Sequence, residues 1–362
     1  MDIVRRKCKV VKIGDVLIGG TNPVAIQSMT KTRTAEVENT VKQINQLKDA
    51  GCQIVRLAIN DFDDAAALKR IKAKVKLPLV ADIHFDWRLA IAAIESGADK
   101  IRLNPGNIDK KQEIGAVISA LKAARIPLRI GLNSGSVKDT RLKKSSMSDK
   151  LVSTCMSYIR MVEGFKFNNI VISLKANNVL DTLAAYRKIS KACNYPLHLG
   201  LTATGSVYSG IIKSSVALGA LLLEGIGDTI RVSLTEKPVE EVRAAKCILE
   251  SLSLRSFGPQ IISCPTCGRC KVNLVGIVKE LENKLSSTDY RQLSRPVKLA
   301  IMGCVVNGPG EAKEADIGVA FGRSEGVLFR HGKVVRKISP GDCVRIVLQE
   351  LKTKEKTWLI KR

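Results

Sequence analysis

Four of the ten cysteines stand in two short motifs whose spacing is typical of metal binding. Cys264, Cys267 and Cys270 follow one another at intervals of three residues, and Cys304 lies in a later glycine-rich run. Thiolates this close together are the ligands that Zn²⁺ and iron–sulfur clusters take in proteins. Because the N-terminus carries charges and no apolar leader, we expect a cytoplasmic protein with reduced thiols. The two motifs therefore predict a metal centre.

A carboxylate follows the last of these cysteines. Glu311 lies seven residues after Cys304, in a run of glycine and proline that we expect to form a turn folding back on the cysteine. A carboxylate is a harder and more labile ligand than a thiolate, so on a four-iron cluster it leaves one iron open to exchange. The residues alone leave a second possibility open, which is a zinc site made by Cys264, Cys267, Cys270 and Cys304.

A second group of residues that could do chemistry lies in the first 255 residues. Its members stand at or just after the ends of predicted strands: Arg56, Asp82, His84, Arg102, Asn104, Arg129, Asn133, Lys175, Arg231 and Ser233. Five of them are cations from five different strands, and Asp82 is the only carboxylate. So much positive charge at one end of a sheet favours a ligand with several negative charges. Structural pairing with acids elsewhere in the chain is the alternative.

The elements that position these residues alternate regularly. Short apolar, β-branched runs predict strands at 24–29, 54–59, 77–84, 100–105, 127–133, 169–176, 197–202 and 229–234. Segments with helical spacing lie between and after them: one ending at Gly51, then 61–75, 86–96, 109–124, 149–164, 179–193, 207–224 and 236–253. Eight strands alternating with eight helices predict an α/β fold of the (β/α)₈ TIM-like barrel type. An open doubly wound sheet is the alternative.

The regular alternation ends at Arg255, and residues 256–259 resemble a linker. We therefore divide the chain into a substrate-binding barrel, 1–255, and a smaller α/β domain, 256–362, that carries the metal site. In the second domain we expect a helix near 272–286, strands at 297–302, 316–320 and 327–329, and a hairpin within 323–337.

The composition bounds the class of protein. The chain has 362 residues and a formal net charge of +25, with 59 Lys plus Arg against 34 Asp plus Glu. These cations are spread along the chain, and aromatic residues make up only 4%, which leaves few platforms for stacking nucleic-acid bases. No apolar run approaches the ~20 residues of a membrane span. We therefore expect binding to neither nucleic acid nor membrane.

Several long motifs resemble the family of bacterial 4-hydroxy-3-methylbut-2-enyl diphosphate synthases of the non-mevalonate isoprenoid pathway. The similarity covers nearly the whole chain. The motifs are Cys264-Pro-Thr-Cys267, Ile301-Met-Gly-Cys-Val-Val-Asn-Gly-Pro-Gly-Glu-Ala312, Ala25-Ile-Gln-Ser-Met-Thr30, Leu79-Val-Ala-Asp-Ile-His-Phe85, Arg102-Leu-Asn-Pro-Gly-Asn107 and Glu224-Gly-Ile-Gly-Asp228.

The resemblance implies a reaction and a set of site residues. Family members reductively open 2-C-methyl-D-erythritol 2,4-cyclodiphosphate and lose water, with electrons that flavodoxin or ferredoxin supplies through a 4Fe-4S cluster. By this resemblance the cluster ligands are Cys264, Cys267, Cys304 and Glu311, and Glu311, His84 and Asp82 are the catalytic candidates. The substrate ligands are Arg56, Arg102, Asn104, Arg129, Asn133, Lys175, Arg231 and Ser233. It also implies head-to-tail homodimers in which the cluster domain of one subunit caps the barrel of the other.

Two residues depart from the family pattern. Ala203 stands where the family carries a glutamate thought to help proton delivery, and Cys270 stands at a position that is not a ligand. We expect Cys270 to be a bystander, although it is also a possible replacement for Glu311. Two other functions remain as alternatives: a basic, zinc-containing RNA-binding protein, and a barrel enzyme of pterin chemistry.

Overall fold

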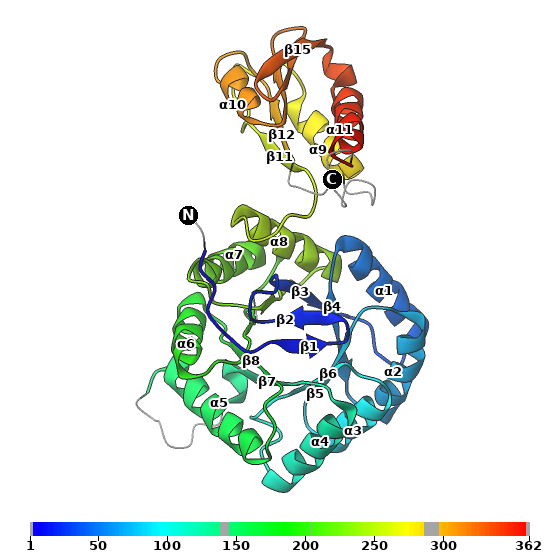
Figure 1. Ribbon diagram of the computed structural model, residues 1–362, viewed down its shortest axis with the longest axis vertical. Helices are drawn as coiled ribbons and strands as arrows, with labels where there is room; N and C mark the ends of the chain where they lie inside the picture. Colours follow the sequence, from blue (N-terminus) through cyan, green and yellow to red (C-terminus); the bar gives the residue numbers. More distant parts are fainter. Residues whose placement is uncertain (1–2, 138–144, 203, 286–296, 360–362) are drawn as a thin grey trace. The chain divides into compact units, whose positions relative to one another are not determined.

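The computed structural model describes residues 3–137, 145–202, 204–285 and 297–359 (Figure 1). Ala203, which the sequence singled out, lies outside the described residues. The chain divides into two compact units, Met1–Arg255 and Ser256–Arg362. Each unit has its own sheet and its own hydrophobic core, so each is described by itself.

The first unit is a closed barrel of parallel strands. Eight strands pair in the order β8-β7-β6-β5-β4-β3-β10-β9, and a parallel bridge between Ile172 and Leu197 joins the two ends of that order. The strands are β3 (Ala25–Met29), β4 (Ile54–Ile59), β5 (Leu79–Ile83), β6 (Lys100–Leu103), β7 (Leu128–Asn133), β8 (Ile170–Lys175), β9 (His198–Leu199) and β10 (Thr229–Ile230). The predicted barrel is confirmed, and the open sheet is wrong.

The last two strands are shorter than predicted. Both were expected to run six residues, and each has two. Beyond Ile230 one more backbone bond, from Arg231 N–H to the Leu199 carbonyl at 3.0 Å, continues the pairing, and side chains add to it. Ser233 Oγ donates to the carbonyl of Leu201 at 3.2 Å, and the Thr204 hydroxyl donates to the carbonyl of Ser233. This end of the barrel is therefore held by loops rather than by regular strands.

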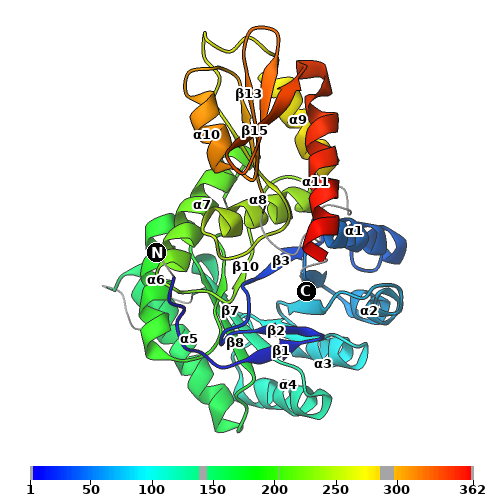
Figure 2. The ribbon, with the colours of Figure 1, turned by 45° about the horizontal axis from the view of Figure 1, so that its top comes forward.

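In the described residues of the first unit, helices α1 to α8 alternate with the strands, and Figures 1 and 2 show them on the outside of the barrel. They bury one face because their apolar residues recur with helical spacing; in the first, Val37, Ile44 and Leu47 face the strands, and Gly51 ends the helix in a left-handed conformation. The helices are α1 (Val37–Ala50), α2 (Phe62–Lys74), α3 (Trp87–Glu95), α4 (Lys111–Ala124), α5 (Met147–Gly164), α6 (Val179–Ala192), α7 (Val207–Leu223) and α8 (Pro238–Ser251).

A hairpin that the sequence analysis missed closes one end of the barrel. Strands β1 (Val11–Ile13) and β2 (Val16–Ile18) pair antiparallel. Their buried side chains pack against Ala25 and Ile54, which are the first residues of β3 and β4. The hairpin therefore covers the N-terminal ends of the strands and leaves the C-terminal ends for ligands.

The second unit is a five-stranded mixed sheet, in the order β11-β12-β13-β14-β15. The first three strands are parallel and the last two antiparallel. The strands are β11 (Gln260–Ser263), β12 (Lys298–Met302), β13 (Ile317–Phe321), β14 (Gly326–Arg330) and β15 (Lys333–Ile338), and the helices are α9 (Leu274–Leu285), α10 (Gly308–Glu314) and α11 (Cys343–Leu359).

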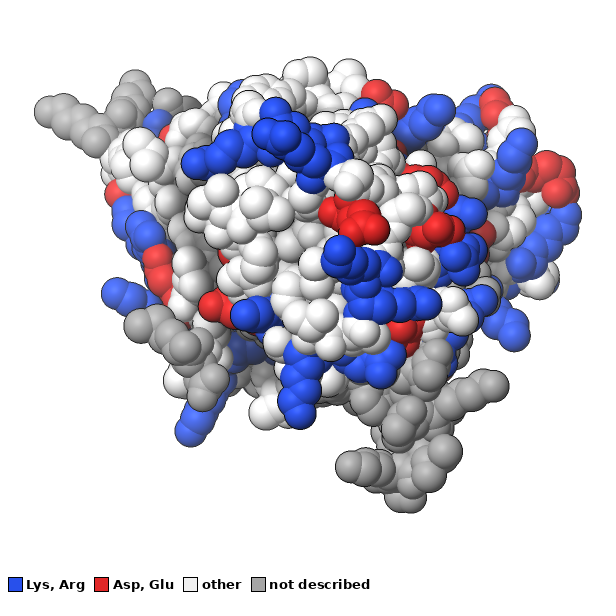
Figure 3. Space-filling view, turned by 90° about the horizontal axis from the view of Figure 1, so that it is seen from above, with Lys and Arg blue, Asp and Glu red and all other residues white. Residues whose placement is uncertain are grey.

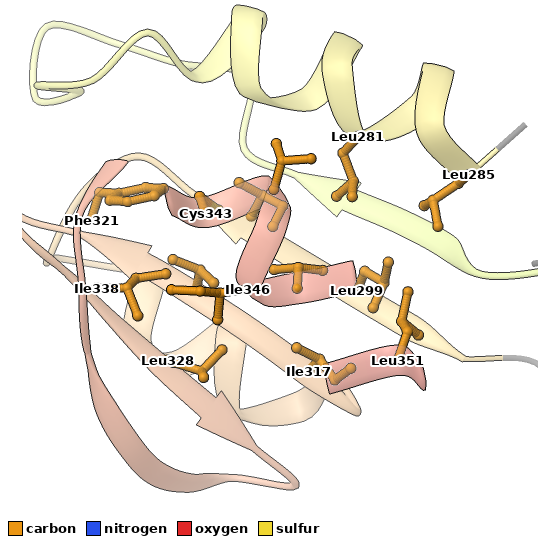
Figure 4. Packing of buried hydrophobic residues seen from close by; sticks show 14 of the residues in the cluster. Leu281, Leu285, Leu299, Ile317, Phe321, Leu328, Ile338, Cys343, Ile346 and Leu351 are labelled. Carbon is orange, nitrogen blue, oxygen red and sulfur yellow. The ribbon is translucent and has the colours of Figure 1, made fainter. Parts of the chain in front are cut away.

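Helices cover both faces of this sheet. Leu281 and Leu285 of α9 and Ile346 of α11 pack on one face, over residues such as Leu299 and Phe321 (Figure 4). Ala312 of α10 packs on the other face. The glycine–proline run before Glu311 was expected to be a turn, which is wrong. It begins α10, because proline is well tolerated in the first turn of a helix.

The surface carries no single block of positive charge in the view of Figure 3. Lys and Arg lie there in several groups separated by Asp, Glu and uncharged residues. Within the described part of the chain, no helix has the length and apolar character that crossing a bilayer requires.

Candidate active site

Nine of the ten residues expected at the strand ends line one pocket of about 250 Å³ in the barrel. They come from successive strands: Arg56 of β4 is in register with Met29 of β3, and Asp82 of β5 with Arg102 of β6. Parallel strands place such neighbours side by side on one face of the sheet. The nine residues are Arg56, Asp82, His84, Arg102, Arg129, Asn133, Lys175, Arg231 and Ser233.

Asp82 is the centre of an ion-pair network on the pocket wall. Its Oδ1 accepts a hydrogen bond from Arg102 Nη1 at 3.0 Å, and its Oδ2 lies 3.5 Å from Arg56 Nε and 3.5 Å from His84 Nε2. Burial opposes the charged form of this carboxyl, but the arginines prevail and hold the pKa of Asp82 well below its usual range. Asp82 is therefore an anion that orients two arginines.

Arg231 has a partner that the sequence analysis missed. Glu241, in the first turn of α8, accepts from Arg231 Nε and Nη2 at 3.2 Å each. The same carboxylate accepts from the hydroxyl of Ser28 and the backbone N–H of Leu234. Its side chain is 1% exposed, so Glu241 positions Arg231 from behind the pocket.

The other two cations of the pocket are Arg129 and Lys175. Neither Arg129 nor Lys175 pairs with a carboxylate among the described residues, although both are almost fully buried. Burial and the arginines at 56 and 231 hold the pKa of Lys175 well below its usual range. Two unpaired buried cations are costly, and an anion with several charges removes that cost. The charge of the pocket therefore suits a ligand with several negative charges.

Two glycines make room for these long side chains. A Cβ on Gly131 would lie 2.6 Å from Arg102 Nε, and one on Gly200 would lie 2.9 Å from Lys175 Nζ. A Cβ on Gly200 would also lie 2.8 Å from the backbone carbonyl oxygen of Arg231, which cannot move aside as a side-chain end can, so this position favours glycine. Arg102 lies against Gly131 and donates from Nη2 to its carbonyl at 2.7 Å.

Asn104 is the one residue of the ten that does not line the pocket. Its Oδ1 accepts from the backbone N–H of Gly106 at 3.1 Å and from the hydroxyl of Ser136 at 3.2 Å. It therefore joins the loop after β6 to the loop after β7. In this structure its contacts are those of a residue that shapes the pocket rim.

The cysteine motifs follow two neighbouring strands of the second unit. Cys264 comes directly after β11 and Cys304 two residues after β12, and the last pair in their parallel register is Ser263 with Ile301. The chain ends of adjacent parallel strands meet at one edge of a sheet. As a result, Cys264 Sγ accepts from the backbone N–H of Gly303 at 3.4 Å.

Two of the thiols lie in electropositive surroundings. Backbone N–H groups of Val306, Asn307 and Gly308 bond to Cys304 and lower its pKa. The backbone and side chain of Arg269 bond to Cys267 and lower its pKa. Lowered pKa values favour the thiolate, which is the form that binds metals. This chemistry fits a thiolate-bound metal group.

The four expected cluster ligands are not gathered into one metal site among the described residues. Among the described residues, no three His, Cys, Asp or Glu side chains are close enough to hold a metal ion together. Glu311 lies exposed in α10. Cys270 Sγ donates to the carbonyl of Val272 at 3.3 Å, and a Cβ on Gly303 would lie 2.4 Å from it.

The fold has distant likenesses among solved structures. Dihydropteroate synthase from Stenotrophomonas maltophilia matches with a TM-score of 0.51 at 13% identity, over 68% of this chain and 99% of that chain. The enzyme from Coxiella burnetii matches with a TM-score of 0.50, also at 13% identity, over 68% and 99%. Identity this low shows a shared barrel and nothing of the chemistry.

The sequence comparisons are much closer. The family model "GcpE TIM-barrel domain" matches residues 8–246, and "GcpE protein C-terminal domain" matches residues 260–353. The protein of Fusobacterium nucleatum named 4-hydroxy-3-methylbut-2-en-1-yl diphosphate synthase (flavodoxin) is 51% identical over 96% of this chain and 97% of its own. Proteins of the same name from Lawsonia intracellularis (50% identical; 96% and 96%) and Clostridium perfringens (49%; 96% and 99%) agree. The chain therefore belongs to the GcpE family, as its motifs predicted.

Proposed function

We propose that the protein makes 4-hydroxy-3-methylbut-2-en-1-yl diphosphate by reductive opening of 2-C-methyl-D-erythritol 2,4-cyclodiphosphate. The observation that carries the proposal is the pocket with five cations, of which Arg129 and Lys175 have no acidic partner among the described residues. The reaction takes up two electrons and two protons and releases one water. The names and similarity of the relatives favour this function over RNA binding or pterin chemistry.

The barrel residues bind and orient the diphosphate. Arg102 and Arg231 are held rigid by Asp82 and Glu241, so their remaining N–H groups face the pocket at no further cost in side-chain entropy. Arg56, Arg129 and Lys175 add charge, and Asn133 and Ser233 add hydrogen bonds. These cations stabilise the negative charge that develops on the phosphate oxygen when the ring C–O bond breaks.

His84 is the residue that we propose for proton delivery. Its side chain is 40% exposed at the pocket, and its Nε2 lies 3.3 Å from Arg102 Nη1. The Thr204 hydroxyl is less suitable because it already donates to the Ser233 carbonyl. Ala203→Glu tests whether the missing acid slows proton delivery. If His84 delivers protons more slowly than the missing acid, the variant turns over faster than the parent, and an unchanged rate contradicts that handicap.

We propose Cys264, Cys267, Cys304 and Glu311 as ligands of a 4Fe-4S cluster. When bound, the cluster supplies the two electrons one at a time. The backbone N–H groups near Cys304 stabilise a thiolate there, and Glu311 is on the helix that starts four residues later. Cys270 is a bystander because its thiol donates to Val272 and lies against Gly303.

Two partners complete the proposal. Flavodoxin is the electron donor in the names of the relatives, and we propose flavodoxin or ferredoxin for this chain in the cytoplasm. We also propose a homodimer. Tyr208, Ile212 and Val216 of α7 are exposed at helical spacing, and a groove of about 340 Å³ lies beside them between α7 and α8. An exposed apolar stripe of this kind is typical of subunit contacts.

A charged residue in that stripe tests the dimer. Val216→Glu places a carboxylate on the apolar face, and light scattering is expected to show a monomer where the parent is a dimer. Lys213→Glu on the same helix is the matched control. A parent that is monomeric at micromolar concentration contradicts the proposal.

The function itself is tested by anaerobic purification followed by iron and sulfide analysis and an EPR spectrum of the reduced protein. We expect four irons per chain and conversion of the cyclodiphosphate to the linear allylic diphosphate with reduced flavodoxin, followed by mass spectrometry. Lys175→Met is expected to keep the iron and lose most substrate affinity. Zinc in place of iron contradicts the proposal.

A further inference from the structure

A lysine and a glutamate join β3 to the segment after β10, at the place where the barrel closes. The register of these two parallel strands has only two residue pairs, and the second ends at Ile230. Arg231 and Ser233, which line the pocket, come after that pair. The ladder with β3 therefore does not reach the two residues of this segment that face a ligand.

Lys31 and Glu241 bond to the backbone of this segment as a neighbouring strand would. The backbone N–H of Leu234 donates to Glu241 Oε1 at 3.1 Å, and the Leu234 carbonyl accepts from Lys31 Nζ at 2.7 Å. Lys31 Nζ also donates to the carbonyl of Glu236, and it lies 3.6 Å from Glu241 Oε1. Backbone groups that leave a ladder need other partners. Here one pair of opposite charges supplies both a donor and an acceptor.

Both members of this pair are also held by β3 and the helix that follows it. The hydroxyl of Ser28 in β3 donates to Glu241 Oε2 at 3.0 Å. Lys31 stands in the loop after β3, and its backbone N–H donates to Gln43 Oε1 of α1 at 2.6 Å. The pair therefore connects β3, the first turn of α8 and residues 231–236.

We propose that Lys31 is a positioning residue for the anionic ligand, because with Glu241 it fastens the segment that carries Arg231 and Ser233 to β3. Lys31 is not among the residues that line the pocket, so it acts through this segment rather than on the ligand itself. The inference rests on the proposed function, since it takes the cyclodiphosphate as that ligand.

The charges give the direction of the effect. Glu241 is 1% exposed and accepts from two nitrogens of Arg231 at 3.2 Å each. By itself this carboxylate would cancel the charge that Arg231 offers to an anion. Lys31 balances the carboxylate, so one acid between two cations leaves a net positive charge at this wall of the pocket. Loss of Lys31 should therefore weaken anion binding and loosen the segment.

The test compares the full-length chain with its variants Lys31→Met, Lys31→Arg and Lys237→Met. Lys237 is exposed in the same loop, and its side chain makes no capping bond to α8. Lys237→Met is therefore the matched control for the loss of one positive charge. Hydrogen exchange of residues 231–236 is measured by mass spectrometry without ligand. Calorimetry then gives the affinity for the cyclodiphosphate, and steady-state turnover of the iron-loaded protein gives kcat and KM.

For Lys31→Met we expect faster exchange in residues 231–236 and a dissociation constant about tenfold higher, because hydrogen bonds to charged groups commonly contribute this much. KM should rise by a similar factor while kcat stays nearly unchanged, since the lost interaction holds the ligand equally before and during the reaction. Lys31→Arg keeps the charge and the donors, so it is expected to restore most of the affinity. Lys237→Met is expected to match the parent.

The outcomes separate this inference from the proposed function. A parent that does not bind the cyclodiphosphate contradicts the function, and exchange without ligand then still shows whether Lys31 holds the segment. Equal exchange in the parent and Lys31→Met overturns the role of Lys31. Faster exchange with unchanged affinity overturns it too, because the bonds would then serve stability alone. Equal losses of affinity in Lys31→Met and Lys237→Met also overturn it, because the charge of the loop in general would be responsible.

Discussion

The barrel pocket and the cysteine loops differ in how far their side chains are held in place before a ligand binds. In the barrel, the charged side chains extend from strands, are buried, and are partly held by Asp82 and Glu241 before any ligand arrives. In the second unit, the thiols stand on loops, Cys267 is exposed, and no three donors are gathered among the described residues. The first site is preorganised by its scaffold. The second is not preorganised, and the proposed metal group would bring its ligands together on binding.

The electrostatics differ in the same way. The barrel gathers cations that repel one another, so an anionic ligand stabilises it. The loops lower the pKa of Cys267 and Cys304, which prepares thiolates for a positive metal core. Binding of an anion should therefore raise the free energy of unfolding of the barrel. Binding of a metal group should instead increase the local order of the loops.

The largest effect is expected from Cys304→Ser. Loss of this thiolate removes a ligand that no other residue replaces, so iron content and turnover should both fall below detection. The barrel pocket contains no part of this loop, so calorimetry should show unchanged affinity for the cyclodiphosphate.

Cys247→Ser is the control for cysteine loss in general. Cys247 is exposed in α8 and is not among the proposed ligands. The variant should keep iron and turnover. If Cys304→Ser also abolishes substrate affinity, the two sites are not as independent as the comparison requires.

The next effect is expected from Asp82→Asn. Removing one partner of a buried ion pair typically costs about 3–5 kcal/mol, because the other charge stays buried. Here Arg102 and Arg56 both lose their acid. Chemical denaturation should show this loss in the barrel transition. Glu240→Gln breaks an exposed pair with Arg243 and should cost at most about 1 kcal/mol. If Asp82→Asn and Glu240→Gln lost similar amounts of unfolding free energy, the buried ion pairs of the pocket would be worth no more than an exposed pair.

Much of the barrel was predictable because its strands are strongly β-branched runs. Those of β4 and β8 were predicted within one residue of their observed ends. The hairpin of β1 and β2 was missed because three-residue strands are too short to show a period. Likewise α10 contains two glycines and a proline, which favour a turn. Its helix depends on packing of Ala312 against the sheet, and the local sequence does not contain that contact.

Some residues of the site could be predicted from the sequence and others could not, for a similar reason. Strand ends in a parallel barrel always meet at one rim, so nine of the ten residues could be placed together before the fold was known. Glu241 could not be predicted, because it stands next to Glu240 in a helix whose sequence is typical of a charged, exposed face. Only the fold shows that Glu241 turns toward Arg231 while Glu240 pairs with exposed Arg243.

A smaller effect, on the free energy of unfolding, is expected when the pH is lowered. The folded-state pKa of Asp82 lies well below its ordinary value of 3.8, so this carboxylate contributes its full stability above about pH 4. As the pH falls from 3.8 towards the folded pKa, the unfolded chain takes up a proton that the folded chain does not, and that stability is lost. Asp82→Asn should remove this part of the acid dependence. The free energy of unfolding, measured between pH 5 and 2 for parent and variant, should converge as the pH falls.

The smallest effect is expected from salt, which acts differently on buried and on exposed charges. Salt screens exposed charges within about 10 Å at 0.1 M, whereas buried pairs are screened much less. With a net charge of +25, the exterior should attract an acidic flavodoxin over long range, so the second-order rate of reduction should fall several-fold between about 0.05 M and 0.5 M salt. The KM for the cyclodiphosphate should change less, because the pocket holds its cations almost fully buried. Stopped-flow reduction and steady-state turnover measure the two quantities in the same buffers. If KM rises as steeply as the reduction rate falls, the pocket behaves like exposed surface, and the contrast between the two sites fails.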